Sequence, residues 1–262
     1  IYGLKNNRHV CIFKNYDSVR GPYFNALFDQ VIEQSGFETK RGLLVRIDDD
    51  NDNLIENLVS DLAFDDITVI RLDKISPRDL KHTIDAFSPT VIWGADAKSA
   101  LRLRYFMRTS GLDFLVETLC GSTNQRSMLY VGEGSSAMCC GSDMNVARNH
   151  DRAPEPQFRG LELLGSDISI TFDQLLPELE GNTILKLLES QVYVWSQCDG
   201  KATSFFMRAD RRGAIEQFRT PDPLPPLVEE DYGGRRCIGE PSVDPSRMLQ
   251  MRGDSEWFEG EM

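Results

Sequence analysis

The chain has 262 residues, of which 40% are hydrophobic and 27% charged, and its formal net charge is -12. This composition is typical of a soluble globular protein with enough chain to bury one complete α/β core, and the sequence has no run of about 20 apolar residues that could cross a membrane. The acidic balance argues against nucleic acid or an anionic membrane as a partner, because both require clustered Lys and Arg.

Strands and helices are predicted to alternate along the first 94 residues. The apolar residues of 23–35 recur at helical spacing before Gly36, and Ser76 followed by Pro77 is typical of a helix start. Strands are expected at 9–14, 43–47, 67–72 and 90–94, and helices at 23–35, 54–62 and from Ser76. This order predicts right-handed βαβ crossovers, and therefore an α/β fold with a mostly parallel central sheet and helices on both faces.

Residues 130–141, YVGEGSSAMCCG, are the most informative stretch of the chain. A short apolar strand runs into a turn of small residues and then into a helix. Hydrolytic α/β enzymes present a nucleophile on such an elbow, beside backbone N–H groups that stabilise an oxyanion. Ligands of these folds bind at the carboxyl ends of the strands, where we expect Gly134 to lie.

This segment resembles the nucleophile turn of the dipeptidase E (α-aspartyl dipeptidase) and cyanophycinase family of serine peptidases, which reads Tyr-(Val/Ile)-Gly-x-Ser-Ala-Gly-Ala. Three further stretches resemble the family in the same order: the helix pair at 103–119, the segment 158–172 and the closing hairpin at 192–206. The resemblance spans roughly residues 89–218. It implies a three-layer sandwich of the class I glutamine amidotransferase-like (flavodoxin-like) type over residues 1–219.

The chain departs from the family at three functional elements. Gly134 stands at the position of the nucleophilic serine, Thr171 at that of the catalytic histidine, and the Gly-Gly-Asn-Thr substrate loop aligns with 97–100. Glycine keeps the turn, since it adopts positive φ without steric cost, but it has no nucleophile. The resemblance therefore implies a homologue that has lost hydrolysis and acts in binding or assembly. Its candidate ligand-binding residues are Gly134, Ser135, Ser136 and Ser99, and its candidate ligand is a small acidic peptide or carboxylate.

An active, divergent serine hydrolase is the alternative. Its nucleophile would be Ser135 or Ser136, and its base would be His150, which has Asp151 beside it. A glutamine amidotransferase-like activity is a weaker alternative, because those enzymes carry cysteine at the elbow and the nearest thiols here, Cys139 and Cys140, lie five and six residues further on.

The six cysteines have neither CxxC nor Cys/His metal spacing, and no phosphate-binding or dinucleotide-binding motif is present, so we expect no metal and no cofactor. We expect Cys139 and Cys140 to pack in the core. Thinly spread thiols are typical of a reduced cytoplasmic protein, although the chain starts at Ile1 rather than Met, and a truncated N-terminus would leave its targeting open.

Residues 220–262 differ in character from the rest. Half of the 12 prolines fall between Pro221 and Pro245. The end of the chain is acidic, with Trp257 and Phe258 as isolated aromatic residues. We expect a Pro/Gly-rich acidic tail, partly extended along the domain and partly disordered. The candidate partners are a second copy of the chain, in a homodimer, or another protein bound through this tail.

Overall fold

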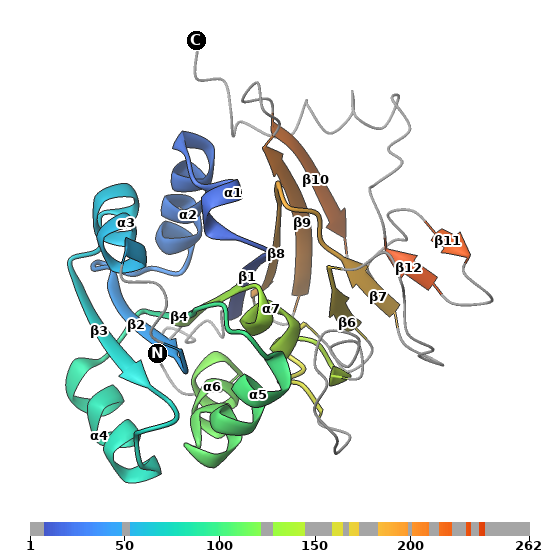
Figure 1. Cartoon of the computed structure of the whole chain (residues 1–262). Coiled ribbons are helices and arrows are strands. Elements are labelled where there is room, and N and C mark those ends of the chain that lie inside the picture. The colour runs from blue at the N-terminus through green and yellow to red at the C-terminus, as the bar shows by residue number, and fades with distance from the viewer. Residues whose placement is uncertain are drawn as a thin grey trace.

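The computed structural model describes residues 8–48, 53–121, 128–144, 159–164, 168–172, 183–198, 201–209, 215–221, 229–231 and 236–238. Its main sheet has eight strands, in the order β10-β9-β8-β1-β5-β4-β2-β3 (Figure 1). These strands are β1 (Arg8–Phe13), β2 (Arg41–Arg46), β3 (Asp66–Arg71), β4 (Val91–Gly94), β5 (Met128–Glu133), β8 (Gln191–Cys198), β9 (Lys201–Ala209) and β10 (Ile215–Pro221).

The main sheet is parallel from β1 to β3 and antiparallel at its other end. β1, β5, β4, β2 and β3 run in the same direction, whereas β8 pairs antiparallel with β1 and β9 pairs antiparallel with both β8 and β10. The predicted α/β fold with a mostly parallel central sheet is confirmed. The closing hairpin expected at 192–206 is also present, as β8 and β9.

Helices cover both faces of the parallel part (Figure 1). The helices are α1 (Tyr16–Val19), α2 (Pro22–Gln34), α3 (Asn53–Leu62), α4 (Pro77–Phe87), α5 (Ala100–Thr109), α6 (Leu112–Gly121) and α7 (Ser135–Cys139). Buried side chains of α1, α2 and α3 pack on one face, and those of α4 to α7 pack on the other. The result is the expected three-layer arrangement.

Local sequence signals explain where several helices begin. Ser76 accepts a hydrogen bond from the Asp79 backbone N–H and Pro77 is the first residue of α4, as predicted. Ser99 caps α5 in the same way through the Arg102 N–H. The four-residue helix α1, capped by Asn15, was not predicted, because one turn is too short to produce a periodic pattern.

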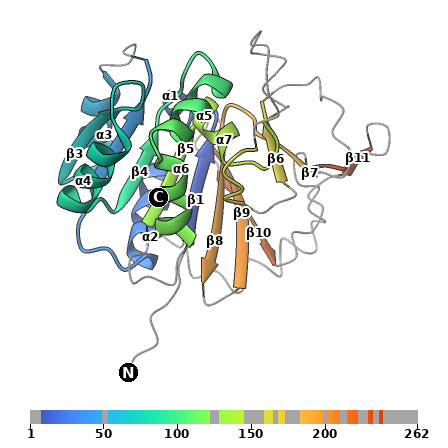
Figure 2. The ribbon, with the colours of Figure 1, turned by 90° about the horizontal axis from the view of Figure 1, so that it is seen from below.

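A second sheet lies beside the antiparallel end of the main sheet in both ribbon views (Figures 1 and 2). It has the order β11-β12-β7-β6, with β6 (Ile168–Thr171), β7 (Thr183–Lys186), β11 (Glu229–Asp231) and β12 (Arg236–Ile238). The boundary predicted at residue 219 falls inside β10. Part of the expected tail is therefore strand, since β12 pairs with β7, and residues 239–262 lie outside the described residues.

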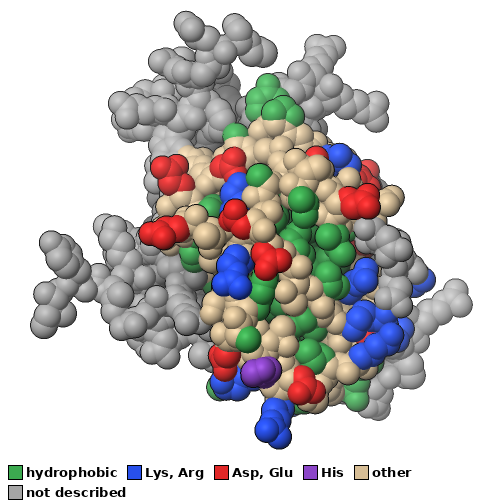
Figure 3. Space-filling view, turned by 90° about the vertical axis from the view of Figure 1, so that its left-hand side faces the viewer, with side chains coloured by type: hydrophobic (Ala, Val, Ile, Leu, Met, Phe, Trp, Pro, Cys, Tyr) green, Lys and Arg blue, Asp and Glu red, His purple; other side chains and the backbone are tan. Residues whose placement is uncertain are grey.

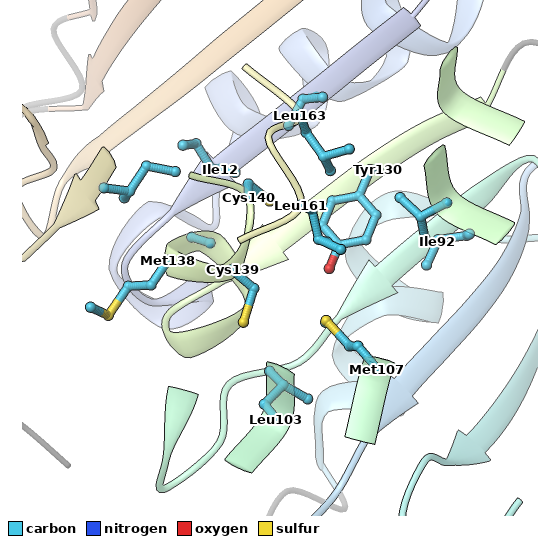
Figure 4. Packing of buried hydrophobic residues seen from close by; sticks show 14 of the residues in the cluster. Ile12, Ile92, Leu103, Met107, Tyr130, Met138, Cys139, Cys140, Leu161 and Leu163 are labelled. Atoms are coloured by element: carbon cyan, nitrogen blue, oxygen red, sulfur yellow. The ribbon is translucent and has the colours of Figure 1, made fainter. Parts of the chain in front are cut away.

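The core on the α4 to α7 side contains both cysteines that follow the elbow. Cys139 and Cys140 are fully buried, and apolar side chains that include Leu103, Met107 and Leu161 surround them (Figure 4). Burial of a thiol in apolar surroundings disfavours its reactive thiolate form. The predicted packing role of these two cysteines is confirmed.

On the surface seen in Figure 3, acidic and basic side chains lie among apolar ones, and several basic side chains gather toward the lower right edge. Within the described part of the chain, none of the helices combines the length and the apolar character that crossing a membrane requires.

Candidate active site

The elbow predicted at Gly134 is present at the carboxyl end of β5. The strand ends at Glu133 and α7 begins at Ser135, so Gly134 alone forms the turn. Its backbone angles are φ 52° and ψ -117°. A residue with a side chain would be strained in this conformation, which is the kind of strain that active-site turns hold. The Gly134 N–H donates to the Phe13 carbonyl and its carbonyl accepts from the Met138 N–H, which fixes the turn between β1 and α7.

The carboxylate of Asp96 lies where a side chain at position 134 would begin. A Cβ built on Gly134 would be 2.2 Å from Asp96 Oδ1 and 2.4 Å from Asp96 Cγ. Both separations are far below van der Waals contact. Asp96 follows β4, the neighbour of β5 in the sheet, so the strand order brings these two residues together. With Asp96 in this position, the elbow has room for glycine only.

Ser135 makes two hydrogen bonds to the loop that follows β4. Its backbone N–H donates to Asp96 Oδ1 at 2.7 Å, and its hydroxyl donates to the Ala97 carbonyl. In α/β-hydrolase elbows the N–H of the residue after the nucleophile is one of the oxyanion donors. Here that donor is already bound to a carboxylate of the same chain.

The other two serines among the candidate site residues have different surroundings. Ser136 is fully buried and its hydroxyl lies 2.8 Å from the Tyr130 hydroxyl, on the core side of the turn. The side chain packs closely under β4, since a Cβ on Gly94 would be 1.8 Å from Ser136 Oγ. Ser99 is occupied as the cap of α5. The structure thus brings Ser135 to the elbow together with loop residues 96–97 and turns Ser136 into the core.

The position at which the family resemblance implies a base holds a threonine, and the alternative base lies outside the described residues. Thr171, at the family's histidine position, is the buried last residue of β6 in the second sheet. His150 and Asp151 lie outside the described residues, so the arrangement of Ser135 with His150 stays a prediction.

The two histidines in the described ranges are both remote from Gly134. His9 pairs with Leu129, four positions before Glu133 on β5, and His82 is exposed on α4. The His9 ring is buried with Nδ1 2.9 Å from Ser196 Oγ, and burial lowers its pKa to about 4. A neutral imidazole that is buried against Ser196 has a structural role.

Glu133 is a functional candidate that sequence reasoning missed. It is the residue immediately before Gly134 and is only 5% exposed. Its Oε1 accepts a hydrogen bond of 2.9 Å from the Tyr16 N–H. Burial raises the pKa of Glu133 to about 7, and the charges of Asp96 and Asp17 act in the same direction, whereas the Tyr16 N–H and the nearby Trp93 side chain lower it.

The contact between Glu133 and Trp93 is electrostatic rather than a well-formed hydrogen bond. Glu133 Oε2 and Trp93 Nε1 are both buried without a partner of acceptable geometry. A carboxyl with a raised pKa beside a catalytic-type turn is a common property of functional sites. The signal available in the sequence was an acidic residue at the end of an otherwise apolar strand, YVGE.

Groups of three or more His, Cys, Asp or Glu side chains suited to holding a metal ion do not occur among the residues that the structure describes. The chemistry offered by the described part of the elbow is therefore that of backbone N–H groups, two carboxyls and the Ser135 hydroxyl.

Comparison with known proteins supports the fold. No family model matches the chain, and no curated protein matches it. Among solved structures, it is similar to the crystal structure of a candidate peptidase E protein from Listeria monocytogenes EGD-e. The TM-score is 0.53 at 12% sequence identity, over 82% of this chain and 98% of the Listeria protein. At this identity the similarity establishes a peptidase E-like, flavodoxin-like α/β fold.

Proposed function

We propose that this protein is a peptidase E-like homologue that has lost serine-peptidase catalysis and acts in binding or assembly. The observation that carries the proposal is the elbow itself. Gly134 keeps the backbone conformation of the turn, and the Asp96 carboxylate fills the space in which a nucleophile would stand.

Two further observations support the loss of hydrolysis. The Ser135 N–H, which would be an oxyanion donor, is bound to Asp96. A negative carboxylate at this point would also repel a developing oxyanion, because like charges at hydrogen-bonding distance destabilise one another. Thr171 supplies no proton shuttle at the position where the family resemblance implies histidine.

A divergent serine hydrolase is the second candidate, and the position of Ser135 favours it over any use of Ser136. Ser135 is partly exposed at the elbow, whereas Ser136 is enclosed. For Ser135 to act, its hydroxyl would have to leave the Ala97 carbonyl and meet a base such as His150.

A small acidic peptide or carboxylate is the ligand class that we propose for the elbow. Such a ligand would compete with Asp96 for the same N–H, so any binding is expected to be weak in the wild-type protein. A protein partner or a second copy of the chain would bind to the surface outside the elbow.

The proposal is tested by hydrolysis of Asp-Leu and of β-aspartyl polymers, together with labelling by a fluorophosphonate probe. The wild-type protein should show neither turnover nor labelling. Ser135→Ala is the informative variant and Ser136→Ala is its matched control, because both remove one hydroxyl from adjacent residues. Turnover or labelling that survives stringent purification and disappears only in Ser135→Ala would replace the proposal with the hydrolase alternative.

A further inference from the structure

The first residue of α7 is tied to the loop after β4 by two hydrogen bonds that we call the clasp. They are the bond from the Ser135 N–H to Asp96 Oδ1 and the bond from the Ser135 hydroxyl to the Ala97 carbonyl. One bond uses a side chain of the loop and the other uses its backbone. The clasp therefore fixes both the Asp96 carboxylate and the path of the chain beside the elbow.

The same loop is attached on its other side to the end of β2. The Lys98 N–H donates to Asp48 Oδ2 at 3.1 Å, and Arg102 in α5 lies 3.9 Å from Asp48 Oδ1. The loop thus connects the carboxyl ends of β2, β4 and β5. The strand order reverses at β2, which has β3 on one side and β4 on the other. Ligands of open α/β sheets bind outside the carboxyl ends of the strands at such a reversal.

We propose that the Asp96 side chain is an autoinhibitory group, which closes the elbow from within the chain and must leave the Ser135 N–H before any ligand can occupy it. This inference rests on the proposed function only in taking the elbow as the binding site. The loop remains attached through Asp48 while Asp96 rotates away, so opening requires movement of one side chain rather than of a domain.

The environment of Asp96 makes this opening accessible. Asp96 is exposed to solvent, whereas Gly134 beneath it is buried. A carboxylate that leaves the Ser135 N–H is therefore immediately hydrated, and the net cost of the exchange is small compared with that of a buried group. The closed form is favoured because the Ser135 N–H loses its carboxylate acceptor when Asp96 moves away.

The test measures the elbow directly, by amide hydrogen exchange of Ser135 resolved by NMR in the full-length protein. In Asp96→Ala the Ser135 amide should exchange roughly 10-fold faster than in the wild type, because a net hydrogen bond of this kind corresponds to about one factor of ten. Exchange at Val131 in the centre of β5 should stay unchanged, which separates local opening from loss of the fold.

Two further variants sharpen the result. Asp96→Asn retains an oxygen acceptor and should give an intermediate rate. Asp48→Ala is the matched control, since it removes a carboxylate that holds the same loop through Lys98 but does not contact Ser135; its effect on Ser135 exchange should be less than about 3-fold.

Sodium acetate then serves as a probe ligand. It should shift the Ser135 amide resonance in Asp96→Ala at concentrations that leave the wild type unchanged. Equal exchange in wild type and Asp96→Ala, equal acetate responses in the two, or an effect of Asp48→Ala as large as that of Asp96→Ala would overturn the proposal. None of these measurements depends on turnover, so hydrolysis by the wild type would disprove the proposed function while leaving the test of Asp96 intact.

Discussion

Placing serine at the elbow tests the relation between Gly134 and Asp96 most directly. In Gly134→Ser the new Cβ would meet Asp96 Oδ1 at 2.2 Å and Cγ at 2.4 Å, so the carboxylate has to move and its bond to the Ser135 N–H is lost. Backbone strain for a residue other than glycine costs about 1–3 kcal/mol, and the lost bond about 0.5–1.5 kcal/mol. We therefore expect Gly134→Ser to lower the free energy of unfolding by roughly 2–4 kcal/mol.

The companion variant is Asp96→Ala, which removes the bond without the strain and should cost about 0.5–1.5 kcal/mol. In the double variant the serine meets no carboxylate, and the bond to Ser135 can be lost only once. The double variant should thus be no less stable than Gly134→Ser alone. The destabilisation of the double variant should therefore fall short of the sum of the two single effects by at least the cost of Asp96→Ala, about 0.5–1.5 kcal/mol.

The assay is urea unfolding of the wild type, the two single variants and the double variant, followed by two independent probes to confirm a two-state transition. Gly36→Ser is the matched control, because Gly36 also has positive φ (+72°) but nothing lies within 4 Å of a Cβ built there. Its effect should add to that of Asp96→Ala. If the effects of Gly134→Ser and Asp96→Ala also add to within about 0.3 kcal/mol, the close contact at the elbow is refuted.

Three other outcomes are expected. Burial raises the pKa of Glu133 from 4.5 to about 7, so the folded protein binds a proton more tightly than the unfolded chain, and this residue lowers stability progressively as pH rises through that window. Glu133→Gln should therefore be more stable than wild type at pH 8, by on the order of 3 kcal/mol, and similar to it near pH 4. Urea titrations from pH 4 to 8 check this, with Glu56→Gln at an exposed position as the control. A free energy of unfolding that depends on pH in the same way in Glu133→Gln and wild type would contradict it. Ser76→Ala removes the cap of α4 and should cost about 1 kcal/mol in the same assay, whereas Ser76→Asp should be nearly neutral. The double variant Gly134→Ser, Thr171→His should show negligible hydrolysis of Asp-Leu, because Asp96 and the altered loop at 97–100 remain. Robust turnover would show that the two missing side chains alone account for the loss of activity.

The periodic elements and the elbow could be predicted because their signals are local. The cap and the proline of helix α4 are adjacent residues, and a run of consecutive small residues predicts the turn at Gly134. Asp96 could not be placed at the elbow from the sequence, since it precedes Ser135 by 39 positions and approaches it only because β4 and β5 are neighbours. The raised pKa of Glu133 likewise depends on burial by α1 and β4, which are distant in the sequence.

The cost of serine at position 134 has a local and a non-local part. Backbone strain at this turn is the local part, about 1–3 kcal/mol for a residue other than glycine. The steric conflict with Asp96 comes from another strand and adds to that figure. Local rules therefore predict the shape of the elbow, and tertiary contacts determine what can occupy it.

The place of β1 in the sheet has a consequence for how the chain reaches its folded state. Among the described strands β1 comes first in the sequence, yet its two neighbours are β5 and β8, and Arg8 is opposite Met128 on one side and Gln197 on the other. During synthesis, β1 therefore emerges long before either strand that pairs with it. Such long-range pairings slow folding and leave hydrophobic segments open to aggregation or to chaperones in the meantime. Assembly of the central sheet is consequently a late event, and an N-terminal fragment ending after α6 would contain β1 without either strand that pairs with it.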